Sequence, residues 1–106
     1  MNGLTNMELF RVDPEIATSL HELSNEDLRS FAVLHKDPAN DEQLELYICT
    51  CFLIFERTRS TEYLGQAIRR TEGWIAVIGL DHPDRARRLQ IFDMMSARYV
   101  LAHVPN

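Results

Sequence analysis

The chain has 106 residues, of which 45% are hydrophobic and 25% are charged. This is the composition of one globular domain, and it excludes a chain that is disordered throughout, which would be poor in apolar residues. The net charge is −5, and a net acidic domain gains little from displacing counterions, so neither nucleic acid nor an anionic membrane surface is expected as a partner. We therefore expect a single domain over residues 1–106.

Two helices are predicted first, and they form an N-terminal helical pair over residues 1–36. Asp13 can cap a helix that has Pro14 in its first turn, where the missing N–H of proline does no harm. Ser24, followed three residues later by Asp27, resembles a capping box that opens the second helix. The apolar stripes that follow are Ile16, Ala17, Leu20 and Leu23 in the first helix and Leu28, Phe31, Ala32 and His35 in the second.

The third predicted helix starts at Asp37 and Pro38 and runs to about Arg57. Apolar residues fill its whole circumference over residues 46–55, which is typical of a helix buried on all sides. A β-strand is the alternative, because the run is rich in residues that favour sheets. The helix is preferred, since no turn residues flank the run and no second strand is available to pair with it.

A fourth helix is predicted to start with Ser60 or Thr61 as its cap and to end at Gly79. Gly65 and Gly73 lie inside it, and glycine weakens a helix, so they indicate close contact with a neighbouring backbone. The predicted core stripe of this helix is Leu64, Ala67, Ile68, Thr71, Ile75 and Ile78, with Trp74 beside it.

A fifth helix is predicted to start within residues 81–83, an Asp-His-Pro sequence. Two pairs of opposite charge spaced four residues apart, Asp81–Arg85 and Asp84–Arg88, support it, because the acidic residue comes first in each pair.

The third and fifth predicted helices are also related by an internal repeat. A shift of about 45 residues aligns apolar and proline positions, and such a period suits two helices and two turns.

Residues 37–102 resemble a tetratricopeptide repeat of the long variety found in fungal multi-repeat proteins. The sequence HPDRARRL at residues 82–89 is similar to the opening of the first helix of such a repeat. FERTRS at residues 55–60 is similar to the end of that helix, and YLGQAI at residues 63–68 is similar to the opening of the second. The resemblance implies an all-α fold of about five antiparallel helices in stacked hairpins, and a scaffold role in which the chain binds proteins or peptides.

The two cysteines and the first residues of the chain indicate an intracellular protein. Cys49 and Cys51 lie in the most apolar run, and side chains two apart on a helix point to nearly opposite sides. They are therefore predicted to be small buried hydrophobic residues in a reducing compartment and not a disulfide. The first residues lack the basic region and long apolar core of a signal peptide, and the apolar run is too short to span a bilayer, so a cytoplasmic location is expected.

No motif of the sequence specifies a reaction, a cofactor or a metal. Asp81-His82-Pro83-Asp84 combines a histidine with two carboxylates, which can transfer protons, but helix capping accounts for all four residues. The histidines are scattered, and the cysteines lack the spacing of a zinc site. We therefore expect no catalysis, no cofactor and no metal. The alternative is a small helical enzyme or small-molecule-binding protein with a pocket near Tyr47, Trp74 and His82.

Two groups of charged residues admit two interpretations each. Arg85, Arg87 and Arg88 can clamp a phosphate or carboxylate, but a solvated helix face paired with Asp81 and Asp84 is preferred. An acidic group near the start of the third helix can receive an Arg-rich partner, but a favourable interaction with the helix dipole is preferred. The members of this acidic group are Asp37, Asp41, Glu42 and Glu45.

The last predicted helix carries two apolar stripes, where an amphipathic surface helix has one. The first stripe, expected to face the preceding hairpin, is Leu89, Phe92, Ser96, Tyr99 and Val100. The second is expected to face outward unless the N-terminal helices cover it, and it is Ile91, Met94, Met95, Leu101 and Ala102. An uncovered stripe of this kind is typical of a protein-binding surface. We expect a protein–protein interaction module, either a homo-oligomer (most simply a homodimer) or a binder of a helical or peptide segment, with Ile91, Met94, Met95, Arg98 and Leu101 as partner-binding residues.

Overall fold

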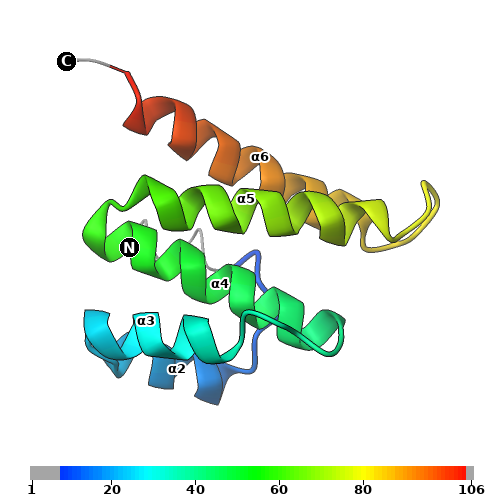
Figure 1. Ribbon diagram of the computed structural model, residues 1–106. Helices are drawn as coiled ribbons and strands as arrows, with labels where there is room; N and C mark the ends of the chain where they lie inside the picture. The colour runs from blue at the N-terminus through cyan, green and yellow to red at the C-terminus, as the bar shows by residue number, and fades with distance from the viewer. Residues whose placement is uncertain (1–7, 105–106) are drawn as a thin grey trace.

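The computed structural model describes residues 8–104, and this part of the chain is all-α, with five helices and no strand. Successive helices run antiparallel, and each packs on the next along the chain from α3 to α6 (Figure 1). The predicted fold class is therefore confirmed. The helices are α2 (Pro14–Glu22), α3 (Asn25–Leu34), α4 (Asp41–Thr58), α5 (Thr61–Ala76) and α6 (Arg85–Ala102).

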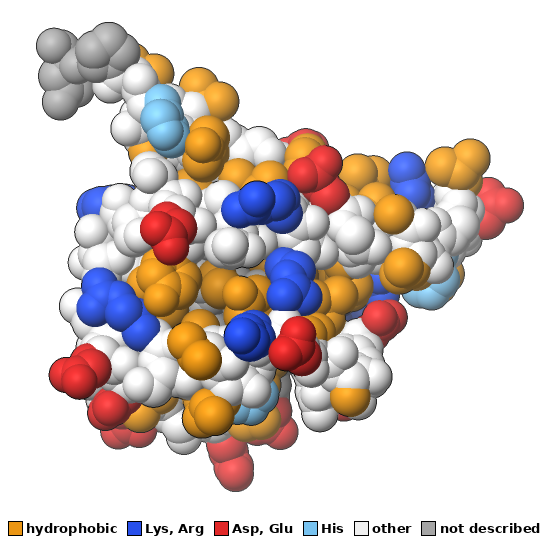
Figure 2. Space-filling model, viewed as in Figure 1, with side chains coloured by type: hydrophobic (Ala, Val, Ile, Leu, Met, Phe, Trp, Pro, Cys, Tyr) orange, Lys and Arg blue, Asp and Glu red, His pale blue; other side chains and the backbone are white. Residues whose placement is uncertain are grey.

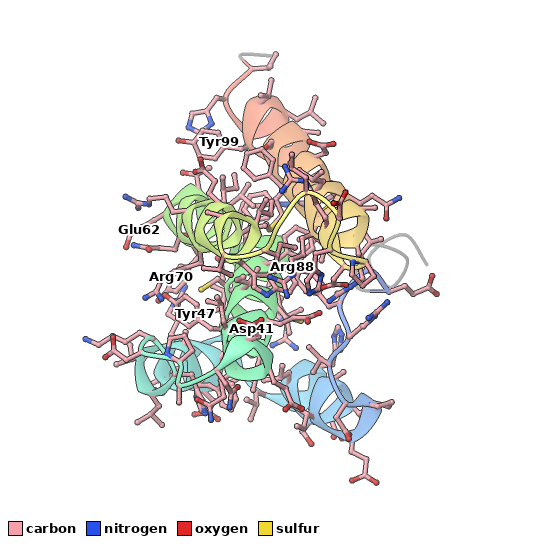
Figure 3. All side chains as sticks on the ribbon, turned by 90° about the vertical axis from the view of Figure 1, so that its right-hand side faces the viewer. Asp41, Tyr47, Glu62, Arg70, Arg88 and Tyr99 are labelled. Atoms are coloured by element: carbon pink, nitrogen blue, oxygen red, sulfur yellow. The ribbon has the colours of Figure 1, made fainter. Side chains whose placement is uncertain are left out.

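Helix α4 is the centre of the molecule. Helices α2 and α3 lie on one side of it, and α5 and α6 lie on the other (Figures 1 and 3). Because neighbours surround it, α4 is apolar around its whole circumference, and the helical interpretation of residues 46–55 is confirmed. Its buried residues are Glu45, Tyr47, Ile48, Cys49, Thr50, Cys51, Phe52, Leu53, Ile54 and Phe55.

The first two helices start where their capping residues predict. The Glu15 N–H donates to Asp13 Oδ1 at 2.8 Å, and the Asp27 N–H donates to Ser24 Oγ at 3.1 Å. The C-terminal end of α2 is then attached to α4 by Arg57, whose guanidinium donates to the backbone carbonyls of Leu23, Leu20 and His21.

The predicted start of α4 at Asp37 is wrong, because Asn40 caps this helix instead. The Gln43 N–H donates to Asn40 Oδ1 at 2.9 Å, and Gln43 Oε1 accepts from the Ala39 N–H at 2.9 Å. These two hydrogen bonds form a reciprocal cap that satisfies two backbone donors, so it prevails over the Asp-Pro sequence upstream.

Helix α5 starts at Thr61 as predicted, but it ends at Ala76 and not at Gly79. The close backbone contact expected at its two glycines is absent. A Cβ on Gly65 would meet only the Tyr99 ring, at 4.0 Å from Cε2, and a Cβ on Gly73 would meet nothing within 4 Å. Gly65 therefore leaves space between α5 and α6, and Gly73 lies in an open position on the helix surface.

Helix α6 starts at Arg85, later than predicted, with Asp84 as the residue that precedes it. Of the two expected charge pairs, Asp84–Arg88 forms, with Arg88 Nε at 2.8 Å from Asp84 Oδ2. Asp81 and Arg85 form no ion pair within residues 8–104. Asp84 instead accepts hydrogen bonds from Arg87 and Arg88 in the first turn of the helix.

Both cysteines are buried and unbonded, as predicted. Burial raises the pKa of the Cys49 thiol to about 12 and that of Cys51 to about 11, so both stay protonated and unreactive at neutral pH. Within the described part of the chain, none of the helices combines the length and apolar character that crossing a membrane requires.

Candidate functional site

A cluster of charged side chains joins the start of α6 to α4, and Asp84 lies at its centre. The Asp84 carboxylate accepts hydrogen bonds from Arg87 Nε and Arg88 Nε, each at 2.8 Å. Arg87 also makes a two-point contact with Glu45 of α4, at 2.7 Å and 3.1 Å. The expectation that Arg87 and Arg88 lie on a solvated helix face is therefore wrong, because both point into the molecule.

Trp74 lies under this cluster. The guanidinium carbon of Arg88 is 4.3 Å from the centre of the Trp74 ring, and that of Arg87 is 5.3 Å away. Arg88 also donates to the Trp74 backbone carbonyl at 2.5 Å and to Asp41 at 3.3 Å, and Figure 3 shows Arg88 and Asp41 side by side. Two residues of the predicted acidic patch, Asp41 and Glu45, are thus used within the chain.

The hydrogen bonds that Asp84 accepts fix its protonation state. Hydrogen bonds from Arg87, and secondarily from Arg88, outweigh the opposing effect of burial and lower the Asp84 pKa to about 2. Burial alone would lower the pKa of Arg87, but its hydrogen bonds to Glu45 and Asp84 raise it instead. Both groups are ionised at neutral pH and already paired, so Asp84 has no capacity left to act as a general base.

The alternative pocket near Tyr47, Trp74 and His82 is not assembled by these residues. Tyr47 is buried, its pKa is raised by burial to about 12, and its ring stacks with the guanidinium of Arg70, whose carbon lies 4.9 Å from the ring centre (Figure 3). Trp74 is covered by two arginines, and exposed His82 accepts from the Asp84 N–H at 3.0 Å. Each residue is engaged in a different local contact. Among the described residues, no group of three or more His, Cys, Asp or Glu side chains could hold a metal ion.

Part of the α6 stripe that is predicted to face outward lies in the core instead. Ile91 and Met95 are completely buried against the rest of the protomer, and Met94 is partly buried. Arg98 pairs with Glu56 of α4 at 3.0 Å. Of the five predicted partner-binding residues, Leu101 is therefore the one that is widely exposed, at 69%. Ile91 and Met95 cannot contact a partner while this packing persists.

The other stripe of α6 lines a groove that it shares with α5. One hollow, of about 450 Å³, lies toward the C-terminal end of α6, and a second, of about 360 Å³, lies toward its start. Consecutive turns of the same two helices line both, so we treat them together as the α5–α6 groove. Its residues are Gly65, Ile68, Arg69, Glu72, Ile75, Ala76 and Ile78 from α5 and the following loop, and Arg85, Leu89, Phe92, Ser96, Tyr99 and Val100 from α6.

Apolar side chains continue from this groove along the end of α6. Tyr99 is 39% exposed and Val100 is 62% exposed. The C-terminal end of α6 projects away from the other helices, and Figure 2 shows hydrophobic side chains on this projecting end and at the tip of the α5–α6 loop. A further hollow at this end is lined by Phe55, Arg59, Thr61, Arg98, Leu101 and Ala102.

The groove also carries charges of both signs. Arg69, Glu72 and Arg85 line it, and none of the three forms an ion pair in the part of the chain that the structure describes. The sequence predicts Ile68 as a core residue, and in the structure Ile68 both packs against the core and lines the groove. A signal for the groove itself is Gly65, because a glycine inside a helix leaves a hollow when the facing side chain does not fill it.

Comparison of the chain with protein-family models, with curated proteins and with solved structures finds no match. The resemblance to tetratricopeptide repeats therefore stays a prediction, and so do the domain division at residue 37 and the cytoplasmic location.

Proposed function

We propose that this chain is a non-catalytic protein-interaction module that self-associates through the α5–α6 groove and the exposed side of the C-terminal half of α6. The observation that carries the proposal is an apolar stripe on α6 beside the groove, in which Leu89, Tyr99 and Val100 are exposed and Phe92 is partly exposed. Single exposed hydrophobic residues are normal on a protein surface, but these lie along one side of one helix beside a groove.

A second copy of the chain is the partner that the charges of the groove favour. A two-fold symmetric interface brings the same surface of two copies together. A positively charged residue of one copy must then meet a negatively charged residue on the matching surface of the other copy. Arg69, Glu72 and Arg85 supply both signs along the groove. A surface of one sign would repel its own copy, whereas this one can form ion pairs with it.

The interaction is expected to be driven by the apolar stripe. Burying apolar surface contributes roughly 25 cal/mol per Å², which is about 1.5–3 kcal/mol for a fully covered Val, Leu or Phe side chain. Part of this is offset by the loss of translational and rotational freedom on association. The stripe is short, so we expect a reversible dimer that dissociates on dilution.

The test is the mass of the protein in solution across a range of concentrations, by size-exclusion chromatography with light scattering. The wild type is expected to rise from the mass of one chain, 12.3 kDa, toward twice that mass. Tyr99→Glu/Val100→Glu, which places two charges on the stripe, is expected to remain at the mass of one chain. Met95→Glu is unsuitable, because Met95 is completely buried and a charge there would unfold the protein.

The matched control is Val33→Glu/Leu34→Glu on α3. These two residues are also exposed and apolar, and they lie on the opposite side of α4 from the groove. The control variant is expected to associate like the wild type. A wild type that keeps the mass of one chain at every concentration would contradict the proposal, and so would equal loss of association in the two variants.

A further inference from the structure

A hollow of about 770 Å³, here called the arginine hollow, lies between the C-terminal end of α6 and the turn that joins α4 to α5. Figure 1 shows these two parts of the chain at the same end of the molecule. The arginine hollow is larger than either hollow of the α5–α6 groove, and its volume is within the range of small-molecule sites. Its residues are Phe55, Arg59, Thr61, Arg98, Leu101 and Ala102.

The arginine hollow is separate from the α5–α6 groove. Arg98 and Ala102 follow Ile91 and Met95 at a spacing of about two helical turns, so all four lie on one side of α6. Ile91 and Met95 are completely buried in the core. The core side of α6 therefore continues into the arginine hollow, whereas Val100 of the groove lies on the other side of the helix.

The arginine hollow has one positive charge in excess. Arg98 Nη1 lies 3.0 Å from Glu56 Oε2, and Arg59 Nη1 lies 3.8 Å from the same oxygen, so two guanidinium groups share one carboxylate. The longer contact is not a hydrogen bond, and the Arg59 guanidinium, which is 71% exposed, donates none within residues 8–104. A ligand with one negative charge would balance this excess and can accept two parallel hydrogen bonds from Arg59.

The backbone of Arg59 has a conformation that arginine rarely adopts. Its φ is 61°, and among the described residues no other non-glycine residue has a positive φ. Glycine and asparagine are the usual residues at such a helix end, because they adopt this conformation with the least strain. The backbone alone therefore does not favour arginine here. Its guanidinium lies beside the hollow, with its carbon 5.7 Å from the centre of the Phe55 ring, and a charge needed there accounts for the residue.

The remaining walls of the arginine hollow define the rest of the ligand. Leu101 and Ala102 give it an apolar side, so the ligand needs an apolar body as well as a charge. Thr61 adds a hydroxyl group, and it is the first residue of α5, whose first turn has no side-chain cap. The positive end of the α5 dipole thus acts in the same direction as the two arginines.

We propose that the arginine hollow binds a small organic acid, whose carboxylate pairs with Arg59 and whose apolar body packs on Leu101 and Ala102. Arg98 supplies the second positive charge near the carboxylate. This binding goes beyond the proposed self-association and does not depend on it.

The test is isothermal titration calorimetry of the wild type with sodium octanoate, a carboxylate with an apolar chain. One saturable site per chain is expected. Acetate lacks the apolar chain and octan-1-ol lacks the charge, so each is expected to bind at least about tenfold more weakly than octanoate. Inorganic phosphate has no apolar body and is expected not to displace octanoate at an equal concentration.

Arg59→Asn removes the charge and keeps a residue that tolerates the left-handed backbone. This variant is expected to bind octanoate at least about tenfold more weakly than the wild type, while its melting temperature does not fall. The matched control is Arg29→Gln, which removes the same charge from an exposed position on α3 and is expected to bind like the wild type. If Arg59→Asn loses its helices, Arg59→Gly replaces it, because glycine adopts this conformation without strain.

The proposal is overturned if octanoate shows no saturable binding, or if octan-1-ol or phosphate binds as tightly as octanoate. Unchanged binding in the folded Arg59 variant would also overturn it. Equal weakening in the Arg59 and Arg29 variants would do the same, because binding would then follow the net charge of the protein and not the arginine hollow.

Discussion

The guanidinium of Arg87 and the carboxylate of Glu45 meet in a two-point contact, with nitrogen–oxygen distances of 2.7 Å and 3.1 Å, although 42 residues separate them in the sequence. Both side chains are largely buried, at 15% and 9% exposure. The contact fixes the start of α6 on the central helix α4. Arg87 lies on the same side of α6 as the buried residues Ile91 and Met95.

We predict that Arg87→Ala destabilises the protein by about 3–5 kcal/mol, because it leaves Glu45 buried without its partner. The measurement is urea unfolding followed by circular dichroism. Arg29→Ala is the matched control, since Arg29 is exposed on α3, and it should change the free energy of unfolding by less than about 0.5 kcal/mol. If the two variants lose the same free energy of unfolding, the Arg87–Glu45 ion pair contributes nothing to stability.

Stability is predicted to fall in acid because of Asp84. The pKa of Asp84 is about 2 in the folded protein, against 3.8 as its ordinary value, so the unfolded chain takes up the proton first as pH falls. The stabilisation is complete above about pH 4 and is lost between about pH 4 and pH 2, and it amounts to roughly 2 kcal/mol. Urea midpoints measured from pH 6 to pH 2 should fall less steeply in Asp84→Asn than in the wild type; parallel curves would exclude this role for Asp84.

Two glycine substitutions in α5 are predicted to stabilise the protein. Gly73→Ala meets no neighbour within 4 Å, and Gly65→Ala meets Tyr99 Cε2 at an ordinary 4.0 Å. Each should therefore add up to about 1 kcal/mol through helix propensity alone. Thermal unfolding measures this gain. A lower melting temperature in Gly65→Ala alone would mean that α5 and α6 lie closer together than described.

The thiols of Cys49 and Cys51 are predicted to be unreactive in the folded protein. Burial raises their pKa values to about 12 and about 11, and both side chains are inaccessible. At pH 8, Ellman's reagent should react with them only as fast as the protein opens, whereas both should react at once in guanidinium chloride. Rapid reaction under native conditions would contradict the packing of α4.

The sequence predicts those parts of the fold that short-range contacts decide. Asp13 and Ser24 cap helices through hydrogen bonds to residues two and three positions away, so a local pattern is sufficient. The sequence offers two capping signals for α4, Asp37 with Pro38 and Asn40 with Gln43, and they lie close together. The capping preference of each residue alone does not decide which signal starts the helix, so the predicted start at Asp37 is wrong.

The orientation of α6 and the contact between Arg87 and Leu9 could not be predicted in this way. The two stripes of α6 are almost equally apolar, and the buried side is the one on which Arg87 meets Glu45 across 42 residues. The hydrogen bond from Arg87 to the Leu9 carbonyl spans 78 residues. A single sequence does not show which residues meet across such separations. For that reason the sequence predicts Ile91 and Met95 on the surface, whereas they lie in the core.

Residue-resolved NMR spectroscopy on dilution tests the central claim, self-association through the α5–α6 groove, most directly. On dilution of the wild type, amide signals of Gly65, Ile68, Tyr99 and Val100 are predicted to shift together along one binding curve, while those of Val33 and Leu34 stay fixed. Signals that do not change with concentration, or changes confined to α3, would contradict it.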